Sequence, residues 1–344
     1  MENIHNLNDL HPNRSIALWL LLCCVAIFAM VVLGGVTRLT GSGLSMVEWE
    51  PLMGILPPLN HVEWEMVFQK YQQYPEYEIK NFQMTLAEFK TIFWFEYAHR
   101  LLGRAIGLIF LLPLLYFAIR RQINQPLIPK LIIMFILGGL QGLLGWYMVK
   151  SGLVNQPQVS QYRLTAHLGL AFLIYAYIFW VALDLLFPKA KHQPKLASLH
   201  YFSWIVTSLV FITAMSGGFV AGLKAGLVYN TFPLMNGHWI PEGLFRIEPL
   251  WHNFFENMTT VQFDHRLLAT LLVILIPMLW FMARRIHLPT RTRWGLHILL
   301  LILGIQITLG ISTLLFFVPV SLAATHQAGA LTLLTAALFV SHEL

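Results

Sequence analysis

The chain has 344 residues, of which 57% are hydrophobic and 11% charged, whereas soluble domains carry about 25% charged residues. Too few polar side chains remain to cover a folded surface of this size, so a soluble globular protein is excluded and a membrane protein is expected. The formal charge of +6 is spread along the predicted loops instead of gathering in a patch, which argues against a nucleic-acid partner.

Uncharged runs of about 20 residues predict the membrane spans. The last run, 294–341, is too long for one crossing, and Val318-Pro319 is the natural place for it to turn back. It therefore contributes two spans, which follow six others at 15–36, 101–119, 131–149, 164–183, 201–223 and 267–283; the run 101–119 is uncharged apart from Arg104. We expect an all-α polytopic membrane protein with eight transmembrane helices.

The loop charges predict the orientation of these spans. One side carries eleven Lys and Arg residues against four acidic residues, and the other carries eleven against twelve in longer loops. By the positive-inside rule, both termini are cytoplasmic and the long loops 38–95 and 224–264 lie outside. The tail 1–14 resembles neither a transit peptide nor a cleavable signal, which favours the inner (plasma) membrane of a bacterium.

Several sequence patterns occur twice, once in each half of the chain. The pairs are Gly34-Gly35 with Gly217-Gly218, His99-Arg100-Leu101-Leu102 with His265-Arg266-Leu267-Leu268, Gly139-Leu140-Gln141 with Gly304-Ile305-Gln306, and Thr165-Ala166-His167 with Ala324-Thr325-His326. They predict tandem four-helix bundles, 15–187 and 200–344, joined by a cytoplasmic linker at 188–199. Because four is an even number, the two bundles have the same orientation and a pseudo-twofold axis along the membrane normal.

Four of the fourteen histidines occupy equivalent positions in the two halves: His99, His167, His265 and His326. Each is predicted to lie where a span enters from the outer side, so all four share one depth. Two inward-facing histidines on neighbouring helices of a bundle are the arrangement that binds a haem iron from both faces. One such histidine alone would more often be an interfacial residue, but ionisable groups at repeated positions within spans favour a functional role.

Zinc is the competing metal, but no cysteine or carboxylate accompanies these histidines at the spacing of a structural site. Cys23 and Cys24 are adjacent in an apolar run and predict no disulfide. Arg100 and Arg266 follow two of the histidines and would either pair with haem propionates or extend to the lipid interface. Nearby glycines would admit a flat macrocycle, although ordinary helix packing explains each of them equally well: Gly103, Gly107, Gly138, Gly139, Gly142, Gly145, Gly169, Gly304, Gly310 and Gly329.

The halves differ at one informative position. Glu96 lies three residues before His99, on the same helix face, and the equivalent residue before His265 is Gln262. A carboxylate can move protons or stabilise positive charge, whereas a glutamine cannot ionise. We therefore expect the first haem to be reactive and the second to carry electrons. The longer first outer loop has an acidic, aromatic-rich stretch near 61–90, either a solvated loop, a lid or a docking surface for an electron donor.

Seven short motifs occur along the chain: 34–45 (GGVTRLTGSGLS), Trp49-Glu50-Pro51, Gly54-Ile55-Leu56-Pro57-Pro58, Glu96-Tyr97-Ala98-His99-Arg100, Thr165-Ala166-His167, Asn230-Thr231-Phe232-Pro233-Leu234-Met235 and Asp264-His265-Arg266. In this combination they resemble the haem A synthase family, in its proteobacterial and mitochondrial branch, and the resemblance runs from about residue 15 to the end. A second branch carries cysteine pairs in the outer loops, which are absent from this sequence.

The resemblance implies an oxidoreductase acting on a CH3 group, which oxidises the C8 methyl of haem O to a formyl group through a hydroxymethyl intermediate. His99 and His167 would then bind the substrate haem O, His265 and His326 a haem b cofactor, and Glu96 would be the catalytic acid. The product is haem A for a terminal oxidase. The expected partners are the lipid bilayer, an unidentified electron donor, haem O synthase or oxidase assembly factors, and further copies of the chain in a homo-oligomer.

Two other functions stay open on the residues alone. A dihaem b-type cytochrome would pass electrons from quinol through two equivalent, permanently bound haems. A parallel-repeat transporter would use the histidines as protonatable groups and bind no haem at all.

Overall fold

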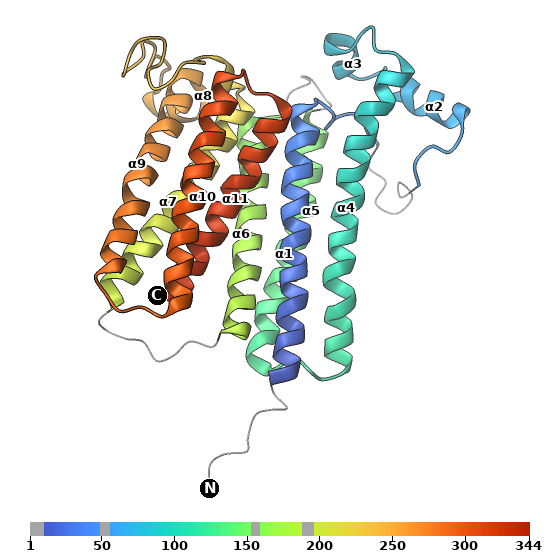
Figure 1. Ribbon diagram of the computed structural model, residues 1–344. Helices are drawn as coiled ribbons and strands as arrows, with labels where there is room; N and C mark the ends of the chain where they lie inside the picture. The colour runs from blue at the N-terminus through green and yellow to red at the C-terminus, as the bar shows by residue number, and fades with distance from the viewer. Residues whose placement is uncertain (1–9, 49–55, 153–158, 188–195) are drawn as a thin grey trace.

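The computed structural model describes residues 10–48, 56–152, 159–187 and 196–344, and these form a helical bundle (Figure 1). The tail 1–9, most of the predicted linker 188–199, and the motif residues 49–51 and 54–55 lie outside the described residues.

Within the described residues, eight helices are long and apolar enough to cross a membrane, which confirms the predicted number. They are α1 (Leu10–Leu39), α4 (Leu86–Ile119), α5 (Ile128–Gly152), α6 (Gln161–Leu186), α7 (Ala197–Gly222), α9 (Met258–Arg284), α10 (Thr290–Leu315) and α11 (Val320–Glu343). The turn predicted at Val318-Pro319 separates α10 from α11, and Phe317 and Val318 both have positive φ there. The first helix begins and the last ends at the same end of the bundle (Figure 1).

Helices α1, α6, α7 and α11 pack against one another in the middle of the molecule, with α4 and α5 on one side and α9 and α10 on the other (Figure 1). Their contact surface is apolar and includes Leu20, Leu331 and Val206, none of which is exposed. A hydrogen bond also joins the two halves: Gln327 on α11 donates to the carbonyl of Val31 on α1 at 2.7 Å. The two predicted bundles are thus joined along one continuous core.

Short helices cover one end of the bundle, which we call the outer end because the loop charges predict it to lie outside. They are α2 (His61–Tyr71), α3 (Pro75–Lys80), α8 (Asn253–Glu256) and the 3-10 turns Ala225–Leu227 and Leu250–His252; another 3-10 turn, Gln125–Leu127, precedes α5. The first helix of each half is followed at this end by a residue with positive φ, Gly41 after α1 and Lys224 after α7. A left-handed residue commonly ends a helix in this way.

Helix α4 begins at Leu86 and not at Leu101, which corrects the predicted start of the second span. Thr85 forms a capping box with Glu88, and the first turns of α4 continue into an aromatic cluster with α2 that includes Trp64, Phe89 and Phe93. His99 therefore lies inside a long helix and not at its start. The predicted outer loop 38–95 accordingly contains α2, α3 and the first turns of α4.

Candidate functional site

Each of the four predicted histidines faces a glycine on the preceding long helix. A Cβ atom placed on Gly34 of α1 would lie 3.1 Å from Nε2 of His99 on α4, and one on Gly217 of α7 would lie 3.2 Å from Cε1 of His265 on α9. These two contacts are equivalent in the repeat. Any larger residue would push the imidazole aside, so the glycines allow the rings to lie against the neighbouring backbone.

The second histidine of each half has the same environment. A Cβ atom on Gly145 of α5 would lie 3.0 Å from Cε1 of His167 on α6, and one on Gly310 of α10 would lie 2.8 Å from Cε1 of His326 on α11. The sequence predicts that a macrocycle or a neighbouring helix approaches Gly145 and Gly310. The structure identifies an imidazole ring as the group that approaches them.

Each half carries two of the histidines. His99 lies on α4 and His167 on α6, and His265 lies on α9 and His326 on α11. Among the described residues, no group of three or more His, Cys, Asp or Glu side chains is placed to hold a metal ion. Two imidazoles in each half match the two axial positions of a haem iron, whereas a structural zinc ion takes four ligands.

Two glutamines, which the sequence analysis used only to align the repeat, hold the backbone beside the second histidine of each pair. The Nε2 atom of Gln141 donates to the carbonyl of His167, and that of Gln306 donates to the carbonyl of His326, both at 3.0 Å. The Oε1 atoms of Gln141 and Gln306 are buried and have no hydrogen-bond partner within the protein. Such orphaned buried acceptors are costly, and their recurrence in both halves fits a polar ligand at each site.

The first histidine of the second half has an additional partner. The Oγ atom of Ser216 lies 2.8 Å from Nδ1 of His265, and this hydrogen bond fixes the ring orientation. The residue equivalent to Ser216 in the first half is Leu33, which offers no such bond. No local sequence signal identifies Ser216, because its partner is remote in the chain.

Glu96 is buried in the outer part of α4, and both of its carboxylate oxygens accept hydrogen bonds. One carboxylate oxygen accepts hydrogen bonds from Ser45 Oγ at 2.8 Å and from the Met46 amide at 2.7 Å. The other oxygen accepts from the guanidinium of Arg100, one turn along the same helix. The carboxylate therefore connects α4 to the segment that follows α1, and it lies three residues, just under one helical turn, before His99.

Arg100 and Arg266 both bind the loop that follows the first helix of their half. Arg100 donates to the carbonyls of Met46 and Glu48, at 2.6 and 2.9 Å. Arg266 donates to the carbonyls of Thr231 and Tyr229, both at 2.9 Å. Each guanidinium thus has a local structural role, while the predicted contact with a propionate stays a prediction.

Gln262 completes this equivalence between the halves. Its Nε2 atom donates to the carbonyl of Tyr229 at 3.0 Å, so it attaches α9 to the loop as Glu96 attaches α4. The two positions differ in charge but share a structural role. Only the half that contains His99 and His167 therefore has an ionisable carboxyl group at this position.

A second buried acid lies in the outer aromatic cluster. Glu76 of α3 is 5% exposed, and its Oε2 atom accepts a 3.3 Å hydrogen bond from the hydroxyl of Tyr71, to which Asn81 donates at 2.7 Å. Burial is the main cause that raises the pKa of Glu76 to about 7, and the charge of Glu96 adds to it while Lys80 opposes it. This carboxyl therefore titrates near neutral pH.

The pKa of Glu76 predicts that the outer cluster loses stability as the pH rises. Because the folded state holds the proton more tightly than the unfolded state, its stability is greatest below pH 4.5 and falls as the pH rises from 4.5 to 7. The total change is at most about 3 kcal/mol. Hydrogen exchange of segment 61–80 at pH 5 to 8 measures it.

The substitution Glu76→Gln should abolish this pH dependence of the free energy of local opening. Glu78→Gln is the matched control, because Glu78 lies on the same short helix but is exposed. An equal pH dependence in Glu76→Gln and in the unmodified protein would contradict the assignment.

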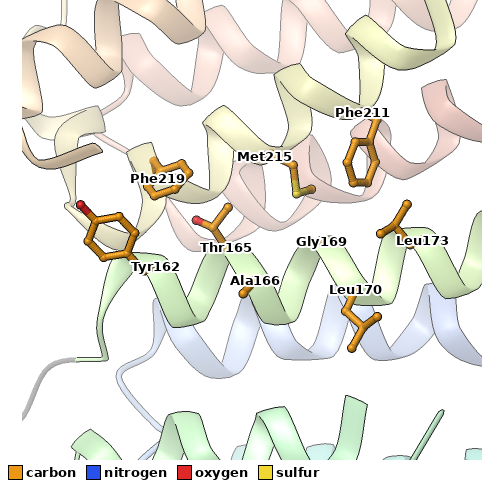
Figure 2. A pocket seen from close by; sticks show the side chains of 9 residues that line it. All are labelled: Tyr162, Thr165, Ala166, Gly169, Leu170, Leu173, Phe211, Met215 and Phe219. Atoms are coloured by element: carbon orange, nitrogen blue, oxygen red, sulfur yellow. The ribbon is translucent and has the colours of Figure 1, made fainter. Parts of the chain in front are cut away.

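An apolar cavity of about 480 Å³ lies between α6 and α7 (Figure 2). Its lining includes Gly169, Phe211, Met215 and Phe219, and none of the four site histidines. The His167 ring faces α5, on another side of α6, so the cavity is separate from the histidine pairs.

Comparisons with known proteins cover almost the whole chain. The model of a family of cytochrome oxidase assembly proteins, COX15-CtaA, matches residues 17–338. The chain is 60% identical over 333 residues to a protein of Nitrosospira multiformis named "Heme A synthase", with 96% of this chain and 94% of that protein covered. It is 50% identical over 339 residues to "Heme A synthase COX15" of Homo sapiens, with 96% and 83% covered. A "Heme A synthase" of Paramagnetospirillum magneticum is also 50% identical, with 96% and 94% covered.

Proposed function

Since this chain belongs to the COX15-CtaA family of cytochrome oxidase assembly proteins, we propose that it is a haem A synthase, the enzyme that converts haem O to haem A. The observation that carries this proposal is the combination of two glycine-backed histidine pairs with a carboxylate beside only one of them. The relatives at 50 to 60% identity are named as this synthase, so they give no support to the dihaem cytochrome alternative.

We assign the substrate haem O to His99 and His167, and a haem b cofactor to His265 and His326. The rings that contact glycine and the orphaned oxygens of Gln141 and Gln306 fit a bound macrocycle in each half. When bound, haem b supplies one-electron redox chemistry. Ser216, which holds the His265 ring, would help to keep the cofactor site fixed while the substrate site exchanges its ligand.

Glu96 is the residue we assign to chemistry at the substrate. Its carboxylate is held by Ser45, Met46 and Arg100, so it is positioned before substrate binds. In this position it would accept a proton from the substrate side or stabilise positive charge that develops during oxidation of the C8 methyl group. Gln262 makes the equivalent loop contact without a charge, and a site that only transfers electrons needs no ionisable group at this position.

The chain is an integral membrane protein, in which we further propose that both termini are cytoplasmic and the histidine pairs lie near the outer face. The predicted charge distribution of the loops supports this orientation. Haem O carries a long isoprenoid chain and dissolves in the bilayer, so a site within membrane helices can receive it without exposure to water.

Extraction of haem from the purified protein, followed by mass analysis, tests the proposal. Protein made in cells that also produce haem O is expected to contain haem b together with haem O or haem A. Two equivalents of haem b with no trace of the other two would instead identify a dihaem cytochrome. A preparation that binds no haem would leave a transporter as the better explanation.

A further inference from the structure

The two halves differ in the size of four residues beside the histidine pairs. Alignment of the repeat on His99 and His265 pairs Gly103 with Ala269 and Gly107 with Val273 on α4 and α9. Alignment on Gln141 and Gln306 pairs Gly138 with Leu303 and Gly142 with Ile307 on α5 and α10. In each case the first half has glycine and the second half has a side chain.

These glycines border open space. A Cβ atom on Gly107, Gly138 or Gly142 would meet no atom within 4 Å, and one on Gly103 would meet only the flexible end of Met30, at 3.5 Å. All four are exposed, whereas Leu303 is only 5% exposed and packs in the core of the second half. The helices that carry them, α4 and α5, are neighbours.

These four glycines lie close, along their helices, to residues of the proposed substrate site. Gly103 and Gly107 lie one and two turns below His99 on α4, and Gly138 and Gly142 adjoin Gln141 on α5. The buried Oε1 atom of Gln141, which has no protein partner, is an independent sign that a ligand occupies this region. We call these four residues the glycine slot: Gly103, Gly107, Gly138 and Gly142.

We propose that the glycine slot receives the long isoprenoid chain of the substrate and selects a prenylated haem over haem b. This inference rests on the proposed function, because it takes His99 and His167 as the ligands of haem O. An extended apolar chain needs volume beside the macrocycle, and the slot supplies it without displacing protein side chains. In the second half, the equivalent positions carry the side chains of Leu303 and Ile307, which pack in or against the apolar core, and this suits a haem that lacks such a chain.

The slot also explains how the substrate enters. Its glycines are exposed on membrane-spanning segments, so the slot faces the apolar phase in which haem O is dissolved. The substrate can then move sideways into the first half, whereas the filled second half retains its cofactor.

Transfer of the second-half residues into the slot provides the test. In the double variant Gly138→Leu, Gly142→Ile, binding of haem O to the first half should weaken roughly tenfold or more, while binding of haem b there changes little. The readout is an absorbance titration of protein whose second site is already filled with haem b. Gly139→Leu is the matched control, because Gly139 lies on the same helix but its repeat equivalent, Gly304, is also glycine.

The outcomes separate this inference from the proposed function. Equal weakening for haem O and haem b, or no weakening for either, would overturn the role of the slot. If the unmodified first half binds no haem O, the proposed function itself fails. Retention of the absorbance of the second-half haem shows that a variant has folded, and Gly142→Ala supplies a milder substitution in which a smaller effect on haem O is expected.

Discussion

Replacement of His265 by alanine is expected to remove haem b from the purified protein and to leave the first half able to bind haem O. His99→Ala should give the opposite result, with haem b retained and haem O lost. The reason is that a haem held by two histidines depends on both imidazoles, and the two histidines of each proposed pair lie on helices of the same half. Each variant should therefore lose about half of the total haem that the intact protein binds.

Haem extraction and absorbance spectra of the purified variants measure this loss. His297→Ala is the matched control, because His297 also lies in a membrane helix but is exposed and contacts Trp280 instead of a second histidine. It should retain both haems. If His265→Ala kept haem b, or if His99→Ala lost both haems while remaining folded, the assignment of one haem to each half would be wrong.

A glycine substitution provides a gentler form of the same experiment in each half, because the rings lie so close to the facing backbone. A Cβ atom on Gly310 would lie 2.8 Å from the His326 ring, closer than such atoms come in practice. Alanine at this position would thus disturb a ligand without removing it. The four facing glycines are as much a part of the proposed sites as the histidines themselves.

The four histidines can be singled out from the sequence because the signal is internal to it. Duplication places the same residue type at the same point of each half, and charged or ionisable groups are rare in membrane spans. The number of spans was predictable for a similar reason, since hydropathy depends on composition over about 20 residues. The start of α4 was not, because the charged residues Glu88, Lys90 and Glu96 interrupt the apolar run in the first turns of that helix.

The roles of Arg100 and Arg266 show where sequence reasoning ends. Arg100 contacts carbonyls of Met46 and Glu48, about 50 residues earlier in the chain, and Arg266 contacts the loop at Tyr229 and Thr231. A backbone carbonyl carries no side-chain signal, so no motif could reveal these partners. The same holds for Ser216 and His265, which only the packing of α7 against α9 brings together.

Glu96→Gln is the change with the largest expected effect on the reaction. It removes the charge and the proton-accepting ability of the side chain but preserves its shape, and it gives the first half the residue that the second half already has at this position. We expect conversion of haem O to fall by about 10²- to 10⁴-fold, the range typical for loss of an acid or base group. Haem O should still bind, because neither His99 nor His167 is altered.

The position of Glu96 in a hydrogen-bonded cluster makes a structural explanation the main rival. Ser45→Ala removes one of the bonds to the carboxylate without removing its charge, and Arg100 keeps its contacts to the carbonyls of Met46 and Glu48 in either variant. If Glu96 acts only as a loop anchor, Ser45→Ala and Glu96→Gln should both weaken haem O binding and lower conversion in proportion. If it acts in the chemistry, Ser45→Ala should convert haem O at near the unmodified rate, whereas Glu96→Gln should accumulate bound haem O. The ratio of haem O to haem A in the extracted protein distinguishes the two, and near-complete conversion by Glu96→Gln would rule out the chemical role.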